Sequence, residues 1–140
     1  MRFMVIVKAN EDTENGVLPT EQQLAEMGAY NEELVKAGVM LAGEGLHPSS
    51  KGARVRFDGD GNTTVVDGPF AETKELVAGF WILEVSSREE VIQWVRKAPF
   101  RDAEVEIRKV AEAEDFGEAF TPELQEKEEQ LRAQSAQQSS

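Results

Sequence analysis

Apolar residues in the first 110 positions follow strand-like spacings in four segments. The segments 2–8 and 76–85 are nearly continuous apolar runs rich in β-branched residues, which predicts two strands buried on both faces. The segment 39–46 is expected to be a third strand, and 103–110 alternates between apolar and polar residues, as a strand with one wet face does.

Two segments have the spacing of amphipathic helices and carry helix start signals. Thr20 and Gln23 predict a capping box, in which each side chain satisfies a backbone N–H of the other. Ser87 and Glu90 predict a second box, and Pro99 ends that helix. The expected apolar stripes are Leu24, Met27, Leu34 and Val35 in the first helix, and Val91, Trp94, Val95 and Ala98 in the second.

Two further segments connect these elements. The stretch 9–19 is polar and is expected to be a loop, whereas 54–66 alternates around a turn of Gly, Asp and Asn and predicts a hairpin. Without the hairpin, the order of elements is β-α-β-β-α-β, which is the ferredoxin-like order. We therefore expect an α+β fold in which an antiparallel sheet has both helices on one face and the hairpin is an insertion.

The two strands that are apolar on both faces predict a second subunit. Two helices cover only one face of the expected sheet, so the other face would be a large exposed apolar patch, which soluble monomers avoid. The simplest cover is the same face of a second copy, related by a two-fold axis. We therefore expect a homodimer whose sheets pack face to face, in the manner of a dimeric α/β barrel.

The composition changes after residue 110. Residues 111–140 contain eight acidic and two basic residues, and so hold half of the net charge of −12. Thr121 and Pro122 predict the start of a helix, and Phe116 and Phe120 are candidates to hold this segment on the body or on a partner subunit. Two pairs of opposite charge lie four positions apart, Glu123–Lys127 and Glu128–Arg132. We expect one domain over residues 1–110 and a solvated, partly helical or disordered extension over 111–140.

Composition limits the classes of protein and partner. A chain of 140 residues with 40% hydrophobic content suits one domain with a core of its own. The chain has no cysteine, which excludes a disulfide and a thiolate site and fits a cytoplasmic protein. No segment approaches the ~20 apolar residues of a membrane span, and the N-terminal segment lacks the features of a signal peptide. The negative charge argues against nucleic acid as a partner.

Asp67 is the first candidate for a functional side chain. It follows a β-branched pair and precedes Gly68 and Pro69, two residues that fix the local backbone and can hold a carboxylate at the end of a sheet. Asp followed by Gly-Pro is also a common turn sequence, in which the carboxylate bonds the next backbone N–H groups. Both interpretations of Asp67, site residue and turn residue, are compatible with the sequence.

Two further residues are candidates for proton transfer. His47 is the only histidine, and an imidazole suits proton transfer near neutral pH, although a loop position before a proline is also typical of an exposed residue. Glu44 lies between two glycines on an expected strand, either in a site or on an exposed face. No group of His, Asp and Glu has the spacing of metal ligands, and no phosphate-binding glycine loop is present, so we expect no metal and no cofactor.

Four residues are candidates for contact with a substrate. Lys74 would hold an anionic group and keep Asp67 ionised, or would belong to a solvated run of charges. Phe70 and Trp81 would form an apolar wall or part of the core. Tyr30 lies on the first helix and could face either a pocket or solvent.

The segment "VVDGPFAETKELVAGFWILEV" resembles the signature of the DGPF-domain proteins, a branch of the YCII-related family. The segments "MRFMVIVKA", "LAGEGLHPS" and "REEVIQWVRKAP" fall where that family would have them, and the resemblance covers residues 1–110. It implies a ferredoxin-like dimeric α/β barrel with a pocket in each subunit near the dimer interface, suspected of enzymatic activity. Related proteins have a histidine–aspartate pair proposed as catalytic; here Asp67 lies in the signature, and His47 would have to be its partner.

Two functions follow from these observations. The first is an enzyme that uses Asp67, with His47 or Glu44, for acid/base chemistry on a small organic molecule without a cofactor, as an isomerase, lyase or hydrolase would. The second is a non-catalytic module that binds a small molecule or a protein partner. Asp67 distinguishes them, because an enzyme requires its carboxylate in a concave site.

Overall fold

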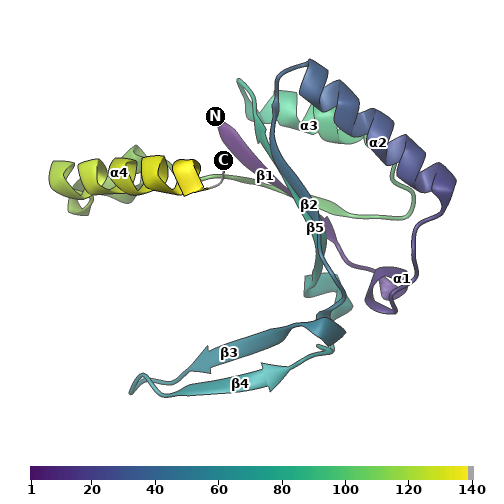
Figure 1. Cartoon of the computed structure of the whole chain (residues 1–140), viewed down its shortest axis with the longest axis horizontal. Helices are drawn as coiled ribbons and strands as arrows, with labels where there is room; N and C mark the ends of the chain where they lie inside the picture. Colours follow the sequence, from purple (N-terminus) through teal and green to yellow (C-terminus); the bar gives the residue numbers. More distant parts are fainter. Residues whose placement is uncertain (139–140) are drawn as a thin grey trace. The chain divides into compact units, whose positions relative to one another are not determined.

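The computed structural model describes residues 1–138 and divides the chain into two compact units, Met1–Lys109 and a second that begins at Val110. The strands of the first unit are β1 (Arg2–Lys8), β2 (Met40–Gly45), β3 (Ala53–Phe57), β4 (Thr63–Asp67), β5 (Val77–Glu84) and β6 (Val105–Lys109). Its helices are α1 (Glu11–Glu14), α2 (Glu21–Lys36) and α3 (Arg88–Arg96), with 3₁₀ turns η1 (Ser49–Lys51) and η2 (Thr73–Glu75). Figure 1 shows these elements along the chain.

Four strands form one sheet in the order β2-β5-β1-β6, and each neighbouring pair is antiparallel. The long helices α2 and α3 lie on the same face of this sheet (Figure 1). The α+β class and the antiparallel sheet are as predicted, and the arrangement is compatible with a ferredoxin-like fold.

The core lies between the sheet and the two long helices. Alternation along the strands points Phe3, Val5, Trp81 and Leu83 toward the helices, where all four are buried. Leu34 of α2 and Val91 of α3 are fully buried against them, and they join these strand residues in one apolar cluster.

The prediction that Leu24 and Val35 belong to the core-facing stripe of α2 is wrong, because both side chains are exposed. The buried residues of α2 are Tyr30 and Leu34, with Met27 packed beside them. Val35 is rotated by about 100° from Leu34 on the helix, and Leu24 lies one turn before Met27, the first residue of α2 to reach the core.

The opposite face of the sheet is apolar at its centre. The register pairs Met4 with Ile82 and Ile6 with Phe80, so these four side chains share the face that points away from α2 and α3. All four are half-buried within the chain. This face is the feature from which the sequence predicted a second subunit.

The segment 9–19, expected to be a loop, contains the short helix α1. The side chain of Asn10 accepts a hydrogen bond from the Thr13 backbone N–H, and the Thr13 hydroxyl accepts one from Asn10, so the two form a capping box. Short polar side chains of this kind favour caps as readily as loops, which is why the polar composition did not distinguish them.

The predicted capping box of α2 is present, because Thr20 and Gln23 exchange hydrogen bonds between side chain and backbone. At α3 only half of the predicted box forms. The Ser87 hydroxyl accepts from the Glu90 backbone N–H, but the Glu90 carboxylate accepts from the hydroxyl of Ser86 instead.

The predicted hairpin is present as a separate two-stranded sheet of β3 and β4. Nine of its ten strand residues are exposed, including Val55, Phe57 and Val65. Asp58 organises the turn, because its carboxylate accepts hydrogen bonds from the backbone N–H groups of Asp60 and Asn62.

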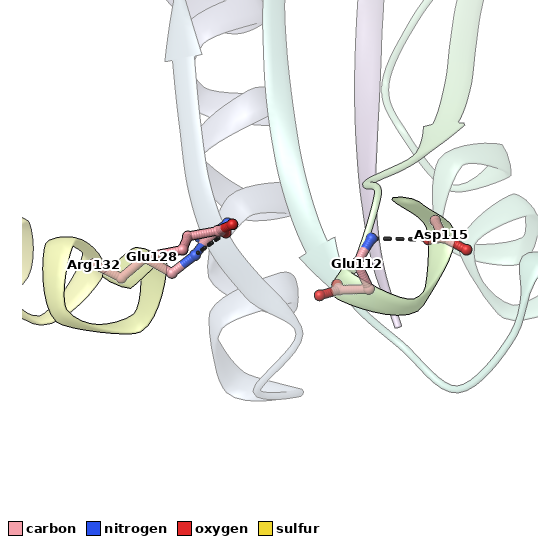
Figure 2. A network of polar contacts seen from close by, with 4 residues as sticks. All are labelled: Glu112, Asp115, Glu128 and Arg132. Atoms are coloured by element: carbon pink, nitrogen blue, oxygen red, sulfur yellow. Dashed lines mark hydrogen bonds and ion pairs between the residues drawn. The ribbon is translucent and has the colours of Figure 1, made fainter. Parts of the chain in front are cut away.

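The second unit consists of a 3₁₀ segment η3 (Ala113–Ala119) and the helix α4 (Pro122–Gln138). Figure 2 shows Arg132 bound to Glu128 one turn away on α4, at 2.8 Å, and Asp115 accepting a hydrogen bond from the Glu112 backbone N–H. The rings of Phe116 and Phe120 pack edge to face at 5.5 Å. Within residues 1–138, we find no helix with the length and apolar content that a membrane span requires.

Candidate functional site

A cavity of about 280 Å³ lies in the first unit, where α2 faces one end of the sheet. The strands β2 and β5 contribute most of its wall, and Val7 of β1 completes the sheet side. Met27 and Asn31 line it from α2, and Phe100 lines it from the segment that follows α3. Because most of these side chains are apolar, the cavity suits the apolar part of a small molecule.

Two glycines of β2 make room on the helix side of the sheet, Gly43 for the Trp81 indole and Gly45 for the cavity. The register places Gly43 opposite Trp81 and Gly45 opposite Gly79, so a side chain at either glycine would point to the helix side of the sheet. A Cβ at Gly43 would lie 2.7 Å from Cδ1 of Trp81, so the indole occupies that space. A Cβ at Gly45 would meet no atom within 4 Å, which leaves the space above Gly45 open to the cavity.

Trp81 is the central aromatic residue of the site. Its ring packs edge to face on Tyr30 at 5.7 Å and on Phe100 at 6.1 Å. Its indole Nε1–H donates a hydrogen bond of 2.9 Å to Oδ1 of Asn31. Trp81 is therefore both a core residue and a wall of the cavity, two roles that the sequence treated as alternatives.

Tyr30 joins the two helices and is not among the residues that line the cavity. Its hydroxyl donates a hydrogen bond of 2.7 Å to the backbone carbonyl of Trp94 on α3. Burial, together with the negative charge of Glu33, raises the pKa of Tyr30 to about 12. The hydroxyl is thus a neutral donor over the physiological pH range.

Glu44 lies on the edge strand β2, which borders the cavity, and His47 lies two residues beyond the end of that strand. Glu44 is one of the lining residues, but its register partner is Phe80, so its side chain leaves β2 on the face opposite to Trp81. The backbone N–H of Leu46 donates to the carbonyl of Ala78, another lining residue, and His47 follows directly as an exposed residue.

Asp67 lies at the base of the hairpin, where it ends β4 opposite Ala53 and is exposed. It is not among the described residues that line the cavity. The next residue, Gly68, donates its backbone N–H to the carbonyl of Gly52, and a Cβ at Gly68 would lie only 1.8 Å from the Ser49 carbonyl oxygen. The Asp-Gly-Pro-Phe segment therefore packs directly on the turn η1, with no space for a side chain at Gly68.

Further contacts hold the Asp-Gly-Pro-Phe segment against η1. The Ser49 hydroxyl accepts a hydrogen bond from the Phe70 backbone N–H at 3.1 Å and donates one to the Glu14 carboxylate. The guanidinium of Arg54 lies 3.8 Å from the centroid of the Phe70 ring. Lys74 lies in η2, and its side chain is outside the described part of the chain.

Five of the seven predicted site residues thus separate into two groups. Trp81 and Glu44 line the cavity and His47 follows two residues after the last lining residue of β2, whereas Asp67 and Phe70 belong to the base of the hairpin. In the part of the chain that the structure describes, no three His, Asp or Glu residues lie together as metal ligands would.

Sequence reasoning missed Asn31, the polar residue that α2 contributes to the cavity. The signal was its spacing, because Asn31 lies four positions after Met27 and so shares that residue's face of the helix. A polar residue in line with an apolar stripe indicates either a polar partner or a cavity, and here both are present.

Comparison with known proteins identifies the family. The YCII-related domain matches residues 1–114. A relative named "Uncharacterized protein R00369", from Rhizobium meliloti (strain 1021), is 34% identical over 76 residues, which are 54% of this chain. The match spans 60% of the length of that relative. The chain belongs to the YCII-related family.

Proposed function

We propose that this chain is a homodimeric small-molecule-binding protein of ferredoxin-like, dimeric α/β barrel type, with residues 1–110 as the family domain and 111–140 as an extension. The observation that supports binding best is the cavity between α2 and the sheet. Its wall is mostly apolar, its volume suits a small organic molecule, and Gly45 of β2 leaves space open to it.

The binding function is tested by filling the cavity. A valine at Gly45 would extend into space where a Cβ meets no atom within 4 Å. We expect small organic ligands to raise the melting temperature of the native chain and to lose that effect in Gly45→Val. Gly28→Ala is the matched control, because a Cβ at Gly28 also meets no atom within 4 Å but that residue does not line the cavity. An equal ligand shift in Gly45→Val would place binding elsewhere.

The dimer is supported by the apolar face of Met4, Ile6, Phe80 and Ile82, which α2 and α3 do not cover. A charge at its centre would oppose the pairing of two such faces, so we expect Ile6→Lys to be monomeric by light scattering where the native chain is dimeric. Val55→Lys, at an exposed hairpin position, should leave the mass unchanged. A folded Ile6→Lys variant that stays dimeric would contradict this interface.

A second candidate function is cofactor-independent acid/base chemistry at the same cavity. The observation that favours it is that β2 brings Glu44 to the edge of the cavity, with His47 three residues further along the chain. Because the Glu44 side chain leaves β2 on the face opposite to Trp81, the reacting carbon would lie at this edge strand and not among the aromatic side chains. In such chemistry, a base removes a proton from the carbon next to a carbonyl group, and an acid returns a proton to the same or a neighbouring atom.

This chemistry is tested by solvent exchange. Incubation of a bound ketone in D₂O should replace its α-hydrogens with deuterium, which proton NMR detects as loss of signal. We expect slower exchange in Glu44→Gln and His47→Asn, each with ligand binding retained. Binding without exchange would leave the protein as a non-catalytic module.

Asp67 is tested separately, as a site residue or as a turn residue. If Asp67 contacts the ligand, Asp67→Asn should reduce the ligand-induced rise in melting temperature. If it acts only in the turn, the ligand shift should stay the same while the ligand-free variant melts at a lower temperature.

A further inference from the structure

The charge of the cavity wall restricts the ligand. Among the described lining residues, Glu44 is the only one with an ionisable side chain, and that side chain leaves β2 on the face opposite to Trp81. No Lys, Arg or His is present among them. The whole chain carries a net charge of −12. A charged group of either sign would therefore leave water without gaining a partner of opposite charge in this wall, which is energetically unfavourable, and the negative charge of the chain disfavours an anion further.

Asn31 gives the cavity a hydrogen-bond donor of known orientation. The indole nitrogen of Trp81 is a donor only, so the Asn31 atom that faces it at 2.9 Å is the amide oxygen. The amide nitrogen is then the other end of the group, and we find no acceptor for it among the described residues. A donor that is held in this way favours a ligand with an acceptor oxygen.

The size and shape of the wall indicate the rest of the ligand. Trp81 and Phe100 pack edge to face at 6.1 Å, and Met27 faces them from α2. A cavity of roughly 150 Å³ is sufficient for benzene. The volume of about 280 Å³ here therefore leaves room for one ring with a short substituent.

We infer that this cavity binds a small uncharged molecule made of one apolar ring and a carbonyl group, with the carbonyl oxygen accepting a hydrogen bond from the Asn31 amide. This inference rests on the proposed binding function and specifies its ligand class. The ring packs against Trp81 and Phe100, and the carbonyl points toward α2.

Four compounds that share a ring and differ in the substituent test the ligand class. Acetophenone has the neutral acceptor, ethylbenzene has none, benzoate is an anion and benzylamine is a cation. We expect acetophenone to raise the melting temperature of the full chain most and benzoate least, with isothermal titration giving the dissociation constants. A larger effect of benzoate or benzylamine would overturn the ligand class but keep the binding function, and an effect of ethylbenzene equal to that of acetophenone would overturn the role of the carbonyl.

Asn31→Asp tests the hydrogen bond. Aspartate keeps the oxygen that accepts from Trp81 but replaces the donor nitrogen with a second oxygen, so we expect acetophenone to bind about tenfold more weakly. Gln93→Glu makes the same chemical change at an exposed position of α3 and should leave binding unchanged. Unchanged affinity in a folded Asn31→Asp variant would overturn the inference about Asn31.

The binding function itself fails under a different result. If none of the four compounds, and none of a wider set of small neutral organic molecules, raises the melting temperature of the native chain, the cavity is not a ligand site and both proposals are overturned. Gly45→Val provides a second variant in case Asn31→Asp does not fold, because it should abolish acetophenone binding without altering the contact between Asn31 and Trp81.

Discussion

The four-stranded sheet and the β3–β4 hairpin are both antiparallel and both contain β-branched residues, but their environments are opposite. In the sheet, Val5 and Leu83 are each 1% exposed. In the hairpin, Val55 is 53% and Val65 is 65% exposed. The difference arises from what covers each sheet, because α2 and α3 pack on the first, whereas no described helix of the first unit packs on the hairpin.

The comparison teaches that a strand pattern predicts backbone conformation more reliably than it predicts burial. A two-stranded hairpin is only marginally stable in water by itself. Here its base is fastened to η1 through Gly68 and Phe70, and a cation–π contact joins Arg54 to Phe70. The Asp-Gly-Pro-Phe segment therefore serves as the joint between the two sheets.

The largest effect is expected when an apolar side chain of each sheet is replaced by alanine and the two losses of stability are compared. Leu83→Ala removes a fully buried side chain and leaves a cavity, so the free energy of unfolding should fall by about 2–5 kcal/mol. Val55→Ala should change it by roughly 0.5 kcal/mol or less, as is usual at exposed positions. Urea unfolding measures both. A comparable loss in Val55→Ala would mean that a partner covers the hairpin.

The joint between the two sheets should be nearly as sensitive. In Gly68→Ala the new methyl group would collide with the Ser49 backbone, so the expected loss is about 1–3 kcal/mol, with faster amide exchange in β3 and β4. Gly59→Ala is the control, because a Cβ there meets no atom within 4 Å. Equal stability of the two variants would show that the joint can move aside.

The layer that covers the sheet depends on the bond between α2 and α3. Tyr30→Phe removes the hydroxyl that donates to the Trp94 carbonyl. Because Trp94 is only half-buried, the free energy of unfolding should fall by roughly 1–2 kcal/mol. Differential scanning calorimetry measures the change. A change near zero would indicate that water replaces the tyrosine hydroxyl.

The raised pKa of Tyr30 predicts a loss of folding stability at high pH. The pKa of Tyr30 is about 12 in the folded chain and near 10 when unfolded, so the unfolded chain loses this proton first as the pH rises. The stabilisation is complete below pH 10 and should be lost between about pH 10 and pH 12. Tyr30 is the only tyrosine in the chain, so ultraviolet absorbance follows its ionisation directly. Tyr30→Phe should lack this part of the pH dependence.

The smallest expected effect concerns the hairpin turn. Hydrogen bonds from the Asn62 backbone and side chain, followed by the Asp60 backbone N–H, hold the pKa of Asp58 below its ordinary value. The ordering of the turn should therefore be present at neutral pH and lost as acid protonates Asp58. NMR chemical shifts of Asn62 should follow this titration and remain constant in Asp58→Asn, whereas the sheet amides should not respond.

The strands and the helix starts could be predicted from the sequence because their signals are local. The apolar run 2–8 and the pair Thr20 and Gln23 each act within a few residues of the chain. The core-facing stripe of α2 was predicted less well, because Tyr30 rather than Val35 faces the sheet, and that depends on how the helix is rotated on its neighbours.

In the candidate site, too, features set by near neighbours in the chain were predicted better than features set by contacts between distant segments. Glu44 and Trp81 were predicted as site residues and line the cavity, whereas Asn31 was missed because its role depends on a contact with a residue fifty positions away. Asp67 is conspicuous in the sequence, but its surroundings are made by the η1 turn, which a local pattern does not describe.

The sequence by itself determined the α+β class, the strands, the long helices and the turn chemistry of the hairpin, but not the short helix α1, since propensity, capping and alternation depend on near neighbours in the chain. It also determined the family, through the residues of the Asp-Gly-Pro-Phe segment and its flanks. Only the tertiary structure decided which apolar residues are buried and which side chains share the cavity. Burial and cavity shape depend on how distant segments pack, and the packing of α2 on β2 and β5 brings Asn31, Gly45 and Trp81 together.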